Sequence, residues 1–131
     1  MSTSIEKVCS STEQNPFLKH VGFEIMKCEG EEILLKLSLQ KEHLNTNLSL
    51  HGGVHAAMLE TVQALVVRYF YKKKSMILNL NVQYLASVKD GEICARAKLI
   101  QKGYKTAITE SEIIDQNNRI IAKGTGVYKI V

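Results

Sequence analysis

The apolar segment at residues 53–71 constrains the fold more than any other part of the sequence. It is rich in Ala, Val, Leu and Met, contains no proline, and is long enough for about five helical turns. Wrapped as a helix, it has apolar side chains on nearly every side, because few polar residues interrupt it: His55, Glu60, Thr61, Gln63 and Arg68. A helix of this kind is buried, so the rest of the chain must enclose it.

The segments on either side of this helix alternate apolar and polar residues, as half-buried strands do. The predicted strands are residues 22–29, 33–39, 76–84, 93–99, 104–114 and 120–131. Short turn sequences such as Asp90-Gly91 and Lys102-Gly103 separate the later ones. Parallel neighbours would need longer crossovers, so these segments predict an antiparallel sheet around one helix, an α+β fold.

We expect one folded domain over residues 15–131, preceded by a flexible N-terminus at residues 1–14. Residues 15–21 favour a short turn of helix at the start of this domain. Gly124 and Gly126 fall on the inner face of the last predicted strand, where the absence of side chains would let the helix pack close to the sheet.

The N-terminal residues are polar and lack the apolar core of a signal peptide, and no apolar run approaches the length of roughly 20 residues that spans a bilayer. We therefore expect a cytoplasmic protein without a membrane partner. Cys9, Cys28 and Cys94 are odd in number and widely spaced, so they predict neither a disulfide framework nor a zinc site. No metal and no cofactor are expected.

The net charge of +4 and the run Lys72-Lys73-Lys74 raise the question of an anionic partner. We expect these lysines to be solvated at the helix C-terminus, where they stabilise the helix dipole. Nucleic acid is not expected, because its binding favours a longer basic stripe with interleaved aromatic residues, and the chain has only three Phe and five Tyr. A phosphorylated small molecule is the better candidate.

Gly52 and Gly53 lie where the buried helix begins, so their backbone N–H groups are among those without intrahelical acceptors. Such groups can polarise a carbonyl oxygen or stabilise an oxyanion, although a Gly-Gly pair alone is more often a tight turn. Glu60 strengthens the functional interpretation, because a carboxylate halfway along an apolar helix is costly when it is dry and unpaired. Its neighbours on the helix offer no cation for a salt bridge.

The pattern Asn45-x5-His51-Gly52-Gly53-x6-Glu60 resembles the signature of hotdog-fold acyl-CoA thioesterases of the phenylacetate-pathway and 4-hydroxybenzoyl-CoA thioesterase type. The similarity continues through residues 79–85 and 102–106 and covers roughly residues 15–131. It implies a hotdog fold, in which an antiparallel sheet of five or six strands wraps one long central helix. It also implies a homodimer or a dimer of dimers, a homotetramer, with sites at the subunit interface.

The resemblance further implies roles for individual residues. The Gly52 amide would polarise the thioester carbonyl, Asn45 would orient substrate and water, and Glu60 would act as general base or nucleophile. His51 is expected to brace the Asn45 loop. The remaining residues expected to bind the acyl-CoA are Gly53, Gln63, Lys102 and Lys105, with the run Lys72 to Lys74 as the alternative for the CoA phosphates.

Two other functions remain open. A non-catalytic hotdog module would hold an acyl-CoA in the same groove without turnover, and the presence of both Asn45 and Glu60 counts against it. A hydratase would need a paired acid and His in one groove, but His55 and Glu60 point about 140° apart around the helix. No Gly-x-Ser-x-Gly elbow, phosphate loop or dinucleotide fingerprint occurs.

Overall fold

The computed structural model describes residues 9, 10, 12, 14–29 and 32–131, and it contains one long helix and six strands in this part of the chain. The elements are α2 (Pro16–Val21), β1 (Glu24–Glu29), β2 (Glu32–Ser38), the short 3-10 helix η1 (Lys41–His43), α3 (Gly52–Tyr71), β3 (Ser75–Tyr84), β4 (Glu92–Lys102), β5 (Thr106–Ile114) and β6 (Ile120–Ile130). The predicted helices and strands are thus confirmed, with shifts of a few residues at their ends.

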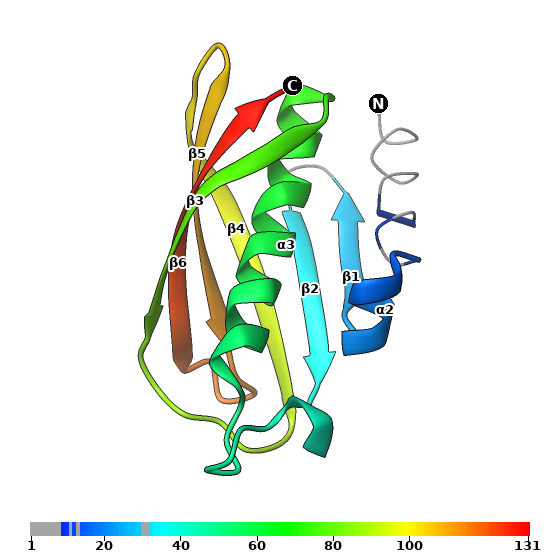
Figure 1. Cartoon of the computed structure of the whole chain (residues 1–131), viewed down its shortest axis with the longest axis vertical. Helices are drawn as coiled ribbons and strands as arrows, with labels where there is room; N and C mark the ends of the chain where they lie inside the picture. Colours follow the sequence, from blue (N-terminus) through cyan, green and yellow to red (C-terminus); the bar gives the residue numbers. More distant parts are fainter. Residues whose placement is uncertain (1–8, 11, 13, 30–31) are drawn as a thin grey trace.

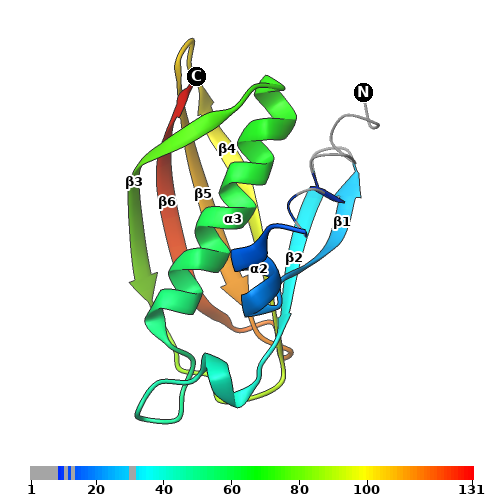
Figure 2. The same cartoon turned by 45° about the vertical axis from the view of Figure 1, so that its right-hand side comes forward.

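The six strands form one antiparallel sheet in the order β1-β2-β4-β5-β6-β3. Helix α3 runs along one face of this sheet and contacts β2, β3, β4, β5 and β6 (Figure 1). Helix α2 lies beside β1 (Figure 2). The expected hotdog fold is confirmed, because the sheet curves around a single central helix.

Helix α3 begins at Gly52 because His51 caps it: the Nδ1 atom of His51 accepts a hydrogen bond of 2.8 Å from the Gly53 amide. It ends at Lys72, which adopts a left-handed backbone conformation with φ 57°. The apolar residues of the helix form the centre of the core with β2, β4 and β6. Among its fully buried members are Met58, Leu59, Val62 and Val67.

Two glycines of β6 set the distance between the sheet and α3, as the sequence predicted. A Cβ atom on Gly124 would lie 3.1 Å from Cδ1 of Leu59, and one on Gly126 would lie only 2.6 Å from Nε2 of Gln63. Both neighbours belong to α3. A methyl group at either position would therefore force the helix and the sheet apart.

We expect Gly126→Ala to lower the free energy of unfolding by about 1–3 kcal/mol, the usual cost of overpacking a close-packed core. The added methyl group would displace the Gln63 amide, which has no space to move into because it is fully buried. Chemical denaturation measures the effect. Lys129→Ala, at an exposed position of the same strand, is the control, and an equal loss of stability in both variants would contradict the close-contact argument.

The order of the strands differs from their order in the chain. β3 pairs with β6, from Ser75 opposite Ile130 to Tyr84 opposite Ala122, although β4 follows it in sequence. The residues between β3 and β4, including the Asp90-Gly91 turn, therefore cross the end of the sheet and do not close a hairpin. This crossing leaves β3 and β1 as the two edges of the sheet.

Cys9 corrects one expectation, because it is buried and takes part in a disulfide bond. Wide spacing in the sequence does not keep cysteines apart once the chain folds. Disulfides are uncommon in a reducing compartment, so this residue gives no support to the predicted cytoplasmic location, which stays a prediction. Most of residues 1–14, the predicted flexible N-terminus, lie outside the described residues.

Within the described residues, every helix is too short or too polar to cross a bilayer.

Candidate active site

A first cavity surrounds the N-terminal end of α3. It lies between the loop that precedes the helix and the end of β3. Its lining residues are Asn45, Leu50, Gly52, Gly53, His55, Tyr84, Leu85, Ala86 and Ser87. The structure thus brings together three of the predicted site residues, Asn45, Gly52 and Gly53, in one place.

The Gly52 amide is the free donor at this helix terminus. No described residue accepts a hydrogen bond from it, whereas the neighbouring Gly53 amide is already bonded to His51. The Gly52 carbonyl accepts a hydrogen bond of 3.0 Å from the Tyr84 hydroxyl, and a Cβ atom at Gly52 would lie 3.3 Å from that oxygen. Glycine therefore fits the close approach of Tyr84, and only the Gly52 N–H remains available to a ligand.

Asn45 holds its own loop. Its Oδ1 atom accepts hydrogen bonds from the amides of Asn47, at 2.8 Å, and Ser49, at 3.2 Å. Its side-chain amide nitrogen donates to no described residue and so is free for a ligand. The His51 side chain caps α3, and its backbone N–H donates to the His43 carbonyl at 2.9 Å across the base of this loop, so the expectation that His51 braces the loop by hydrogen bonding stays a prediction.

Glu60 lines a second cavity, of about 470 Å³, between α2 and α3. The residues around it are Thr12, Asn15, Phe17, Leu18, Ala57, Thr61, Ala64, Leu65, Arg68, Lys73, Lys74 and Ser75. The Glu60 side chain is half-buried, and within the described part of the chain its carboxylate has no hydrogen bond or ion pair. Burial raises its pKa above the usual range, because the charged form loses water without gaining a partner.

A buried polar network fixes the backbone of Glu60. The Tyr128 hydroxyl donates to the Glu60 carbonyl at 3.0 Å, and Gln63 Nε2 donates to the same hydroxyl at 3.2 Å. The Ser111 hydroxyl in turn donates to Gln63 Oε1 at 2.9 Å. Burial and the nearby Glu60 charge both raise the pKa of Tyr128.

The network corrects the expectation that Gln63 binds substrate. Gln63 is 0% exposed, and both ends of its amide are bonded inside the core, so it faces the sheet and lines neither cavity. The sequence did not single out Tyr128 or Ser111. Their signal was present but weak, because each is a polar residue at an inward position of an alternating strand.

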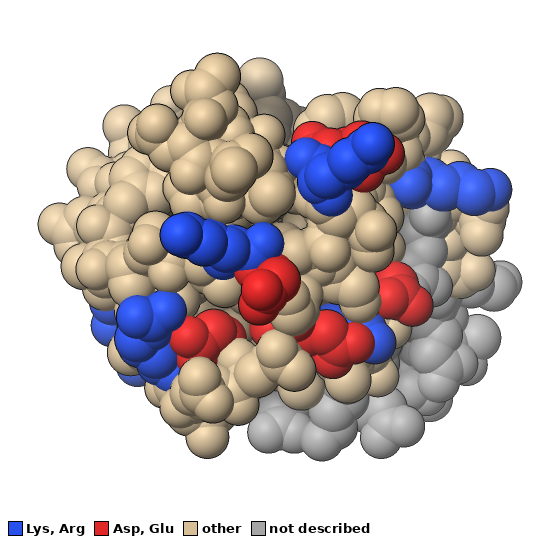
Figure 3. All heavy atoms as spheres, turned by 90° about the horizontal axis from the view of Figure 1, so that it is seen from below, with Lys and Arg blue, Asp and Glu red and all other residues tan. Residues whose placement is uncertain are grey.

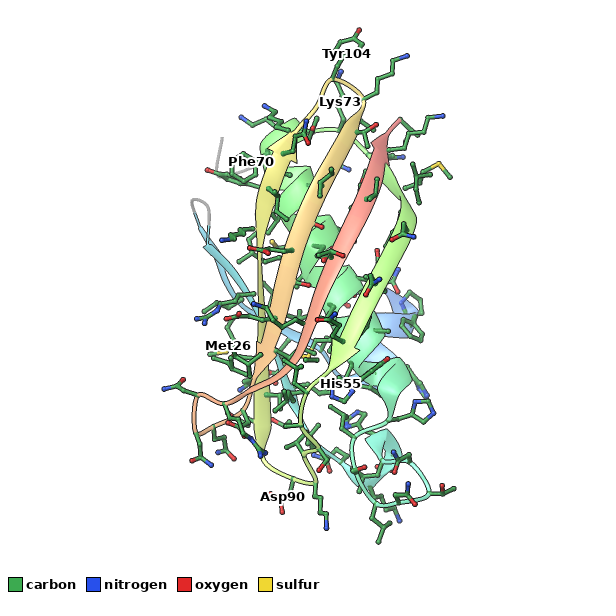
Figure 4. All side chains as sticks on the ribbon, turned by 90° about the vertical axis from the view of Figure 1, so that its left-hand side faces the viewer. Met26, His55, Phe70, Lys73, Asp90 and Tyr104 are labelled. Atoms are coloured by element: carbon green, nitrogen blue, oxygen red, sulfur yellow. The ribbon has the colours of Figure 1, made fainter. Side chains whose placement is uncertain are left out.

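The predicted lysines lie at the opposite end of the molecule from Gly52. Lys102 Nζ sits 5.4 Å from the centre of the Tyr71 ring, and Lys105 Nζ sits 6.0 Å from that of Tyr104. Figure 4 shows Tyr104 and Lys73 together at this end, with His55 far from them. On the face seen in Figure 3, which carries the start of α3, basic and acidic side chains are interspersed.

Gly52 and Glu60 do not share a cavity within one chain. They are eight residues apart on α3, which is about 12 Å along the helix axis. Gly52 offers a free N–H donor and Glu60 an unpaired carboxylate, and one chain holds these groups in two separate cavities.

Known structures share this fold over almost the whole chain. The PaaI protein of the phenylacetic acid degradation operon of E. coli is similar with a TM-score of 0.90 and 18% identity, over 99% of this chain and 95% of that one. A thioesterase from Haemophilus influenzae is similar with a TM-score of 0.88 and 22% identity, over 97% of this chain and 90% of that one.

Sequence comparison agrees with the fold. A relative from Sulfurisphaera tokodaii, named "Putative esterase", is 24% identical over 92% of this chain and 90% of its own length. The family model described as Thioesterase superfamily matches residues 49–122, which include the Gly52 loop, Glu60 and the strands up to β6. The match covers more than half of the chain, and the chain therefore belongs to the thioesterase superfamily.

Proposed function

We propose that this protein is an acyl-CoA thioesterase, which hydrolyses a thioester to a free acid and CoA. The observation that carries the proposal is the unpaired, half-buried carboxylate of Glu60 in a cavity on the same helix whose N-terminus offers the free Gly52 amide. These groups match the two needs of thioester hydrolysis, a base or nucleophile and a carbonyl-polarising donor.

In the proposed reaction, the Gly52 N–H donates a hydrogen bond to the thioester oxygen and stabilises the negative charge that develops on it. Asn45 orients the substrate and the attacking water through its free amide nitrogen. Glu60 takes a proton from the water, which attacks the carbonyl carbon, and the carbon–sulfur bond then breaks to release the thiol. In the alternative mechanism, Glu60 attacks the carbonyl carbon directly and displaces the thiol, and water then hydrolyses the resulting mixed anhydride.

The proposed site is shared between two subunits, because one chain keeps Gly52 and Glu60 in separate cavities. A two-fold axis that sets two α3 helices antiparallel would bring the Gly52 half of one subunit to the Glu60 half of the other. The edge strand β3 suits such a dimer, since its Met76 and Leu78 side chains are 51% and 56% exposed. A dimer, or a dimer of such dimers, is the proposed assembly.

The proposed contacts for the CoA phosphates are basic residues, and the chain offers two groups. Arg68, Lys73 and Lys74 line the cavity that holds Glu60. Lys102 and Lys105, the residues predicted from sequence, lie at the same end of α3, each beside an aromatic ring. Because the first group shares a cavity with the proposed catalytic carboxylate, we favour it for the phosphates.

The proposed substrate class includes aromatic acyl groups, in keeping with the resemblance to phenylacetate-pathway and 4-hydroxybenzoyl-CoA thioesterases. Phe17, from α2, lines the Glu60 cavity and offers an aromatic surface for an acyl group. Met58 and Gln63 are fully buried and do not shape that cavity. Short-chain and medium-chain acyl groups are the alternative substrates to compare with the aromatic ones.

We expect the purified protein to release free thiol from at least one member of a panel of aromatic, short-chain and medium-chain acyl-CoA esters. The measurement is the rate of thiol release at each substrate concentration, with heat-denatured protein as the control. Binding of these esters without turnover by any of them would favour the non-catalytic acyl-CoA binding module instead.

A further inference from the structure

His55 carries a buried polar atom that no described residue satisfies. The residue is 4% exposed, and in the described part of the chain its Nε2 atom is the one buried side-chain nitrogen or oxygen without a hydrogen-bond partner. Such atoms are rare in native proteins, since leaving one unpaired costs much of the free energy of a hydrogen bond. The thioesterase chemistry proposed above makes no use of it.

The other nitrogen of the ring determines what Nε2 can do. Nδ1 of His55 lies 3.3 Å from the carbonyl oxygen of His51, and a carbonyl can only accept, so Nδ1 carries the hydrogen. Burial lowers the pKa of His55, which keeps the imidazole neutral. In a neutral ring with Nδ1 protonated, Nε2 has a lone pair and accepts a hydrogen bond.

His55 lines the same cavity as Gly52 and follows it by three residues on α3, about 4.5 Å along the axis. Figure 4 places it between the start of α3 and the end of β3. Among the groups that line this cavity are two free donors, the Gly52 N–H and the Asn45 side-chain amide, and a free acceptor, the His55 Nε2.

The Tyr84 ring contacts the His55 ring, and both residues line the same cavity. The two rings are 5.2 Å apart at an angle of 89°, and Tyr84 is itself 55% exposed. One hydrogen bond, to the Gly52 carbonyl, holds the Tyr84 hydroxyl. Binding at Nε2 would require this exposed ring to move aside.

We propose that His55 Nε2 is a substrate-binding acceptor, which takes a hydrogen bond from an O–H or N–H group that an acyl thioester carries within a few covalent bonds of its carbonyl carbon, because His55 and Gly52 line one cavity. The inference rests on the proposed function, because it uses Gly52 as the donor to the thioester oxygen.

Two groups of an acyl thioester satisfy this description. One is a hydroxyl on the third carbon of the acyl chain. The other is the first amide N–H of the arm that carries the thiol, which lies on the opposite side of the carbonyl carbon. Both groups can donate a hydrogen bond to a neutral imidazole. Substrate analogues that lack one group or the other distinguish between them.

Two substitutions of His55 test the roles of its two ring nitrogens separately. His55→Gln places an amide near the position of Nε2 and keeps an acceptor there. His55→Asn has a shorter side chain, which keeps a donor near Nδ1 for the His51 carbonyl and removes the acceptor. Thermal unfolding of both variants establishes that they are folded before any binding is compared.

The experiment measures Kd for unreactive ketone analogues of the thioester, in which a methylene group replaces the sulfur, so that the amide N–H keeps its distance from the carbonyl carbon. One matched pair carries the rest of CoA, with and without the hydroxyl on the third acyl carbon, and is measured by calorimetry. A second pair carries either the short amide-bearing arm of N-acetylcysteamine or a plain alkyl arm without the amide, and is measured by NMR titration.

We expect the wild-type protein and His55→Gln to bind the donor-bearing member of one pair about tenfold more tightly, and His55→Asn to show less than about a twofold difference. A preference in the CoA pair assigns the donor to the acyl hydroxyl, and one in the second pair assigns it to the thiol arm. The inference is overturned if the wild-type protein shows neither preference, if His55→Asn keeps it, or if no analogue binds.

Because these analogues are not hydrolysed, the result is independent of turnover. Wild-type protein that shows the His55-dependent preference but releases no thiol from any acyl-CoA would sink the proposed function and leave the acceptor site standing. Release of thiol by a protein that shows no such binding preference would support the proposed function and overturn the His55 acceptor site.

Discussion

Replacing Glu60 with glutamine will reduce kcat by about a hundredfold or more, the scale expected for the loss of a general base or nucleophile. The amide has nearly the same shape as the carboxylate, but it can neither accept the proton from water nor attack the thioester carbon. Small neighbours, Ala57 and Ala64, border this position, so the exchange should not disturb packing. Steady-state thiol release measures kcat, and thermal unfolding checks the fold.

Glu42→Gln is the matched control, because it removes one carboxylate from an exposed position of η1. We expect its kcat to match that of the wild type. A Glu60→Gln variant that keeps activity within a few-fold of wild type would remove Glu60 from the mechanism.

The pH dependence of the wild-type enzyme gives an independent check on the same residue. A general base works only when it is ionised, and burial raises the Glu60 pKa above the usual range. The value of kcat/KM should therefore fall as the pH is lowered through this raised pKa, at a higher pH than an exposed glutamate would give. Glu60→Gln should lose this acid limb.

Much of the fold could be predicted because its helices and strands follow from local patterns of apolar and polar residues. The change from a period of two to a helical period located α3, and Gly124 and Gly126 indicated the close contact that the structure has with Leu59 and Gln63. The order of the strands was not predictable in this way. The pairing of β3 with β6 depends on which strand edges meet after the chain crosses the end of the sheet. The alternation of apolar and polar residues identifies a strand and its two faces, but it does not identify the neighbouring strand.

Parts of the candidate site could be found from the sequence because the residue types stand out at their positions. A carboxylate on an apolar helix and a glycine at its start are unusual enough to be noticed, and the structure places each beside a cavity. Gln63 was misassigned because its sequence position shows that it is polar but not which way it points. Its partners Tyr128 and Ser111 come from strands that are remote in the chain.

Co-expression of Asn45→Asp and Glu60→Ala will restore roughly a quarter of wild-type activity, although each variant alone is inactive. In a mixed dimer, one of the two sites combines Asn45 from the Glu60→Ala subunit with Glu60 from the Asn45→Asp subunit. Random pairing makes about half of the dimers mixed, each with one intact site of two, which gives the quarter. Affinity tags of two kinds isolate the mixed dimers, and their thiol release is measured directly.

Aspartate is the right substitution at Asn45, because its oxygen can still accept the hydrogen bonds from Asn47 and Ser49 that hold the loop. It removes the free amide donor and adds a negative charge to the cavity of Gly52, which also disfavours an oxyanion there. Co-expression of Glu60→Ala with Glu60→Gln is the control, since no pairing of these subunits supplies a carboxylate, and it should stay inactive. The physical reason for rescue is the separation of about 12 Å between Gly52 and Glu60 along one helix, too far for a single thioester carbon to contact both. Mixed dimers as inactive as their parents would mean that each subunit completes its own site, and α3 would then have to deliver Gly52 and Glu60 to one substrate by a rearrangement within the chain.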